Sequence, residues 1–110
     1  MASTAVKVTI PSGVGGVSGE VDFTQYRSLV VHFPAGWVTT DLVVQASDDV
    51  VAGGDYKDIA DEGSAPLKIG TAVGGTVRSA PQGIRDAAWF KLKSVSDQGG
   101  DKQLTLILKG

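Results

Sequence analysis

Carboxylates are the most concentrated reactive groups in this sequence. Six acidic residues fall between positions 48 and 62, namely Asp48, Asp49, Asp55, Asp58, Asp61 and Glu62. Loops that carry several carboxylates can bind Ca²⁺ through hard oxygen ligands. The spacing here lacks the D-x-D-x-D-G pattern, and no glutamate closes a loop of fixed length. Aspartates in turns also bond their own backbone, so we predict solvated turns, with a calcium site as the alternative.

Other catalytic or metal constellations do not stand out. His32 is the single histidine and there is no cysteine, so a zinc site would lack its usual nitrogen and sulfur ligands. No nucleophile-elbow motif is present. The glycine-rich stretches GVGG (13–16) and AVGGTV (72–77) precede neither a helix nor a Lys-Ser/Thr pair, which argues against a phosphate cradle. We therefore predict no enzyme activity and no cofactor.

Aromatic side chains offer a second kind of chemistry, because sugar rings stack on them. Trp37 and Tyr56 are candidates for such a platform, together with the acidic loop at Asp48 and Asp49. This gives one hypothesis, a carbohydrate- or receptor-binding module, with or without calcium. The opposing interpretation places each aromatic ring in the core or in an interface, since these rings bury large areas.

Charge and composition exclude several classes of partner. The chain has 110 residues, a formal net charge of −2 and no basic run, so binding to nucleic acid by phosphate neutralisation is not expected. Its apolar runs are far shorter than a membrane span. The start, MASTAVKVTI, lacks the charged and apolar regions of a signal peptide. We expect one domain over residues 1–110, made in the cytoplasm.

Short alternating segments must position these groups. Val6, Val8 and Ile10 alternate with polar residues near the start, and Leu104, Leu106 and Leu108 do so near the end. Turn signals recur about every ten residues, and no helical period is long enough for a helix. The pattern predicts an all-β fold, an antiparallel β-sandwich resembling a jelly roll with eight or nine short strands, with a closed barrel as the alternative. Residues 89–93 and 104–108 are predicted to form a hairpin.

The stretch Phe33–Asp49, FPAGWVTTDLVVQASDD, is predicted to lie at the centre of this sandwich. Its apolar face is expected to carry Leu42, Val44 and Ala46. Several strands, however, are also apolar on the face that should be polar. The residues concerned are Val30, Val43, Trp89 and Ile107.

Together these four residues predict an outward patch on one sheet, of the kind that marks interfaces. The alternatives are that β-branched residues simply favour strands, or that loops cover them.

The glycine-rich residues 12–19, SGVGGVSG, have two interpretations. Glycine gives the backbone freedom, so this part of residues 1–19 is expected to be a flexible loop. Alternatively, it is a mobile arm that docks on a neighbour through Val14 and Val17.

The segments 33–49, YKDI (56–59), WFKLKS (89–94) and QLTL (103–106) together resemble small β-sandwich virion proteins of tailed bacteriophages. In that family a segment of the type P-A-x-W-T-x-A-x-L-x-F-Q-x-S-x-D-G leads to a strand beginning with tyrosine, followed by strands of the types W-I-K-L-R-S-G and R-x-L-T-L. The match spans about residues 27–109. Asp48-Asp49-Val50 departs from it, since the family has Asp-Gly there.

The resemblance implies a structural role in the virion, for which the capsid decoration (cement) type is our prediction. Its expected partners are further copies of itself, with a trimer favoured, and the major capsid protein or another virion protein. Binding would be passive, through buried apolar area and a rim of hydrogen bonds. The expected contact residues are Trp89, Val43, Val30 and Ile107, with Val14 and Val17 on the arm.

Overall fold

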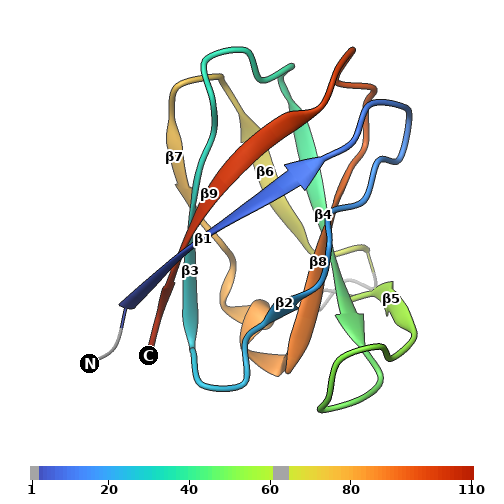
Figure 1. The fold of residues 1–110 in the computed structure, drawn as a ribbon, viewed down its shortest axis with the longest axis vertical. Helices are drawn as coiled ribbons and strands as arrows, with labels where there is room; N and C mark the ends of the chain where they lie inside the picture. Colours follow the sequence, from blue (N-terminus) through green and yellow to red (C-terminus); the bar gives the residue numbers. More distant parts are fainter. Residues whose placement is uncertain (1–2, 61–64) are drawn as a thin grey trace.

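A computed structural model describes residues 3–60 and 65–110. In these residues the chain forms two antiparallel sheets that face each other (Figure 1). Sheet A has the order β1 (Ser3–Ile10), β9 (Lys102–Lys109), β3 (Ser28–His32), β7 (Val77–Ser79). Sheet B has the order β2 (Val21–Asp22), β8 (Trp89–Ser94), β4 (Thr40–Ser47), β5 (Tyr56–Asp58), and β6 (Lys68–Ala72) also pairs with β4. One short 3₁₀ helix, η1 (Gln82–Asp86), precedes β8. The predicted antiparallel sandwich is confirmed.

The path of the chain is that of a jelly roll. If β4, β5 and β6, which all lie in sheet B, are counted as one position, each successive strand lies in the other sheet. Apart from β4 with β5 and β6, neighbouring strands in each sheet are therefore distant in sequence, as in the double Greek key of jelly rolls. The two long strands β1 and β9 come from opposite ends of the chain and pair along their whole length, from Ser3 with Lys109 to Ile10 with Lys102.

The predicted hairpin between residues 89–93 and 104–108 is wrong. β8 pairs with β2 and β4 in sheet B, whereas β9 pairs with β1 and β3 in sheet A. The connection 95–101 therefore crosses from one sheet to the other. An alternating pattern cannot separate the two arrangements, because both strands direct the same apolar phase into one shared core.

Alternating apolar residues of the two sheets form that core. Leu104, Leu106 and Leu108 of β9 are fully buried and face Leu42 and Val44 of β4, which are fully buried too. Aromatic rings close the lower part, where Phe23 meets Phe90 edge to face with ring centroids 5.5 Å apart. The predicted central position of β4 is confirmed, since it pairs with β8, β5 and β6.

The connections gather at the two ends of the sandwich. At the upper end of Figure 1 lie the connections 11–20, 33–39, 73–76 and 95–101. At the lower end lie the β2–β3 connection (23–27), the loop 48–55 and η1. Hydrogen bonds join neighbouring connections at the upper end, for example from the Val38 N–H to Gln98 Oε1 (2.8 Å).

Candidate functional site

The outer face of sheet B is covered by its own side chains and by the loop 48–55. The Tyr56 hydroxyl donates to Glu20 Oε2 at 2.6 Å, so this side chain reaches from β5 to the segment before β2. The same carboxylate oxygen accepts the Gly53 N–H at 3.1 Å. These two hydrogen bonds, that from Tyr56 above all, hold the pKa of Glu20 below its ordinary value. The network fastens the loop to the face of the sheet.

Trp89 also holds the loop 48–55 on the outer face of sheet B. Its indole Nε1 donates to the carbonyl oxygen of Val50 at 3.1 Å, and the ring is half-buried. A buried or half-buried indole N–H needs an acceptor, and here the chain supplies it from its own loop. The alternative considered from the sequence, that loops cover the apolar residues, therefore describes Trp89.

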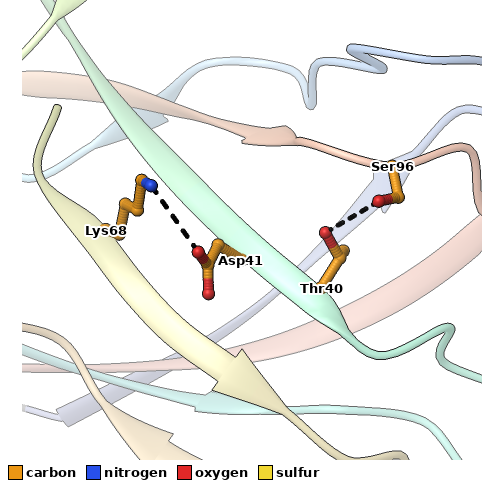
Figure 2. A network of polar contacts seen from close by, with 4 residues as sticks. All are labelled: Thr40, Asp41, Lys68 and Ser96. Atoms are coloured by element: carbon orange, nitrogen blue, oxygen red, sulfur yellow. Dashed lines mark hydrogen bonds and ion pairs between the residues drawn. The ribbon is translucent and has the colours of Figure 1, made fainter.

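Lysine side chains on the outer face of sheet B are also engaged in contacts with neighbouring residues. Lys93 Nζ lies 3.7 Å from Asp58 Oδ1, and Lys91 Nζ lies 4.4 Å from the centre of the Tyr56 ring. Lys68 Nζ lies 3.7 Å from Asp41 Oδ2 (Figure 2). Val43 stands between Lys68 and Lys93 in the register and is 4% exposed. The expectation that Val43 contributes an exposed apolar group is therefore wrong, because its charged neighbours and adjoining strands cover it.

Figure 2 also shows how the start of β4 is fixed on both sides. Asp41 points to Lys68 on β6, while the adjacent Thr40 donates from Oγ1 to Ser96 Oγ at 3.1 Å. Ser96 lies in the 95–101 connection, so this contact ties that crossing segment to sheet B.

The outer face of sheet A has a different character. Its central row runs Ala5, Ile107, Val30, Ser79 across all four strands, each residue opposite the next. The next row is Lys7, Thr105, His32, Val77. On this phase of the described strands the charged groups are Lys7 and Lys109, and no Asp or Glu is present. The result is an apolar centre with a basic and neutral border.

The predicted single outward patch is wrong. Val30 and Ile107 are neighbours on sheet A, whereas Trp89 and Val43 belong to sheet B. The four residues therefore occupy opposite faces of the sandwich. Alternation places residues in the outer phase of a strand, but strands distant in sequence can lie in either sheet.

The glycine-rich segment is docked on its own chain. Ser18 N–H donates to the Leu92 carbonyl and Ser94 N–H donates to the Gly16 carbonyl, both at 2.9 Å. Val17 pairs with Lys93 as an isolated bridge and is half-buried. Instead of the expected flexible loop or mobile arm, the structure has an extension of sheet B that leaves Val14 83% exposed at its tip.

Two aspartates of the 95–101 connection hold the tip of this segment. Asp97 Oδ1 accepts the Gly13 N–H at 2.8 Å, and Asp101 Oδ1 accepts the Ser12 N–H at 3.0 Å. Gly13 adopts a φ of 110°, a conformation that side chains disfavour. A Cβ at Gly16 would collide with the Pro11 carbonyl oxygen. Glycine is therefore needed at positions 13 and 16 because the backbone is tightly turned there.

The alternative ligand-binding residues do not form an exposed platform. Trp37 is 5% exposed and packs on Phe33, with ring centroids 5.1 Å apart. Its indole Nε1 is buried and has no hydrogen-bond partner among the described residues. Tyr56 is engaged with Glu20 on the opposite edge of sheet B. The expected role of Trp37 as a sugar platform is wrong, since its ring is enclosed.

The acidic loop is a turn in the described residues. Asp48 Oδ1 accepts the Asp55 N–H at 3.0 Å, and Asp49 Oδ1 accepts the Val50 N–H at 2.7 Å. These carboxylates bond the backbone of their own loop, as predicted. In the described part of the chain no three His, Cys, Asp or Glu residues are grouped as metal ligands. Asp61 and Glu62 lie outside the described residues.

Sequence reasoning missed Gln98. It lies in the polar connection between the two strands of the predicted hairpin, yet it is 2% exposed. Its Oε1 accepts the Val38 N–H at 2.8 Å and its Nε2 donates to the Val38 carbonyl at 3.0 Å. The side-chain amide thus pairs with one residue's backbone as a neighbouring strand would. Glutamine type alone carries no signal for such burial.

Among the described residues, no helix is long and apolar enough to cross a membrane. No protein-family model matches this chain, and a search of curated proteins by similarity found no match. Among solved structures, the fold is similar to the crystal structure of the SPBc2 prophage-derived protein YomS. That likeness has a TM-score of 0.57 at 13% sequence identity, and it covers 98% of this chain and 95% of that chain. At this identity the likeness establishes the shared sandwich fold.

Proposed function

We propose that this chain is a structural subunit of a phage particle, a capsid decoration protein that acts through protein–protein contacts. The observation that carries the proposal is the fold likeness to a prophage-derived protein over nearly the full length of both chains. The sequence resemblance to virion proteins of tailed phages points the same way. The proposal assigns no catalysis to the chain and locates it in the virion.

The outer face of sheet A is the proposed contact surface. Ile107 and Val30 lie side by side at its centre, and Ala5 continues the row on the edge strand β1. Lys7 and Lys109 border this centre. An apolar centre with a polar rim is the usual anatomy of a protein interface. Each Å² of apolar surface buried there would contribute roughly 25 cal/mol.

Sheet B supports this choice by contrast. Its outer face already carries the Tyr56–Glu20 hydrogen bond, the ion pairs of Lys93 and Lys68, and the loop held by Trp89. A partner would have to break these contacts before binding. Sheet A presents Ile107 and Val30 without such a cover among the described residues. The proposed partners are further copies of the chain, as a trimer, and the major capsid protein.

Co-sedimentation with capsids tests the proposal. The capsids come from the phage that encodes the chain and are stripped of decoration. The wild-type protein should pellet with these capsids, and the variant carrying Val30→Lys and Ile107→Lys should stay in the supernatant. Val51→Lys is the matched control, because Val51 is 57% exposed on the loop at the opposite sheet. This control should pellet like the wild type.

Two results would contradict the proposal. One is a wild-type protein that never pellets with capsids. The other is a double variant that pellets like the wild type, which would remove sheet A as the contact face. Light scattering adds the oligomeric state, and a monomer at every concentration would exclude the trimer.

A further inference from the structure

Three adjoining hollows surround the β2–β3 connection at the lower end of the sandwich. The first, of about 760 Å³, is lined by residues 23–27, Val50, Arg85, Ala87 and Ala88. The second, of about 310 Å³, shares Gln25 and Tyr26 with the first and extends to β1. The third, of about 270 Å³, shares Arg27 and Arg85 with the first and extends along residues 80–84. Arg27 and Arg85 thus line two hollows in common.

These two arginines have no acidic partner among the described residues. The ion pairs there join Lys68 to Asp41 and Lys93 to Asp58. Neither guanidinium has a hydrogen bond to the described part of the chain, and both side chains are exposed. A guanidinium presents a planar fork of donors that matches a carboxylate, so two free forks beside one hollow form an anion-binding arrangement.

The backbone that carries the arginines is held in place. Phe23 N–H donates to the Ala88 carbonyl and Arg27 N–H donates to the Lys109 carbonyl, both at 2.8 Å. Arg85 lies on η1, which is anchored by the fully buried Ile84. A site on fixed elements loses little freedom when a ligand binds.

The hollows also restrict what the ligand can be. Besides the arginines, the first hollow is lined by Thr24, Gln25 and Ala88, a mixed polar and apolar surface that suits a peptide better than a bare inorganic anion. Glu20 and Asp22 border the second hollow, so an acidic ligand would avoid it. The favourable path runs from the first hollow into the third.

We propose that the first and third hollows bind an acidic peptide segment of a partner protein, with Arg27 and Arg85 each pairing with a carboxylate. This site lies at the lower end of the sandwich, apart from the proposed contact face on sheet A. It does not depend on the capsid role, because a peptide probe tests it without a virion.

The test is an NMR titration of the full chain with a blocked peptide of eight glutamates. Saturable shifts are expected at residues 23–27 and 80–88, with none at Thr4 and Val6 of the second hollow. The variant with Arg27→Ala and Arg85→Ala should bind about tenfold more weakly or worse. Lys57→Ala, an exposed change of the same charge on β5, should bind like the wild type. The amide spectrum shows directly whether each variant is folded.

Three outcomes would overturn the proposal. The first is the absence of saturable shifts at residues 23–27 and 80–88. The second is equal binding by the wild type and the Arg27/Arg85 double variant. The third is tighter binding of inorganic phosphate or of a single-stranded oligonucleotide at the same residues, which would assign the pair to a phosphate ligand instead.

Discussion

The buried amide of Gln98 leads to the sharpest prediction about stability. Gln98→Leu keeps a similar volume but removes both hydrogen bonds to the Val38 backbone, at 2.8 and 3.0 Å. It also removes a longer contact of 3.4 Å to Ser94 Oγ. Each neutral hydrogen bond contributes about 1 kcal/mol, so we expect a loss of about 2 kcal/mol in the free energy of unfolding. For a domain of this size that corresponds to a decrease of roughly 8 °C in Tm.

Urea and thermal unfolding followed by circular dichroism measure this loss. Gln103→Leu is the matched control, since Gln103 is exposed on β9 and its replacement should change the free energy by less than about 0.5 kcal/mol. A Gln98→Leu loss no larger than that of the control would refute the reasoning, because the amide would then contribute nothing to the joining of the two connections.

Gln98→Glu adds a signature in pH. Its carboxylate would still accept the Val38 N–H but would face the Val38 carbonyl, so the folded state should favour the protonated acid and raise its pKa. A raised acid pKa lowers stability as pH rises above the unfolded value, about 4.3. The variant should therefore be close to wild type near pH 4 and clearly weaker at pH 7. A loss that is the same at both pH values would contradict this account.

Three further changes test other contacts. The pKa of Glu20 is lowered chiefly by the Tyr56 hydroxyl, so wild-type stability should fall as pH decreases below 4.5, and Glu20→Gln should flatten that part of the pH profile. Asp97→Ala should speed amide exchange over residues 12–18 in a hydrogen-exchange experiment, while unchanged exchange would show that the segment needs no such anchor. Trp89→Phe should lose about 1 kcal/mol in urea unfolding and keep the oligomeric state in light scattering. If Trp89→Phe changes the oligomeric state, the indole lies in an interface between subunits.

The alternating strands were predictable from the sequence. The inward residues of β1 and β9 recur at every second position, and Val8, Ile10, Leu104 and Leu106 are buried as expected. The central place of β4 was also predictable, because Leu42 and Val44 share one phase in a long strand. A period-two pattern identifies the side of a strand that faces the core, and these residues do face the core.

The pairing of strands was not predictable in the same way. The 95–101 connection joins sheet B to sheet A, although its short polar composition resembles a hairpin loop. The assignment of each strand to a sheet decides which outer residues are neighbours. The wrong hairpin and the wrong single patch therefore have the same cause. Val30 meets Ile107 only because β3 pairs with β9.

Several side chains are governed by contacts that no local pattern encodes. Trp37 is enclosed by packing on Phe33, and Gln98 is buried because a backbone segment 60 residues away needs its amide. Trp89 is covered by a loop that follows β4 rather than its own strand. In each case the residue type is compatible with an exposed role and with a buried one, and the tertiary contacts determine which role the residue has.

The most direct test of the central claim is quantitative mass spectrometry of density-purified particles of the phage that encodes this chain. A capsid decoration subunit should be present in those particles, in a fixed ratio to the major capsid protein that is the same from one preparation to the next. Its absence from purified particles, with abundant protein in the infected-cell extract, would contradict the proposed role.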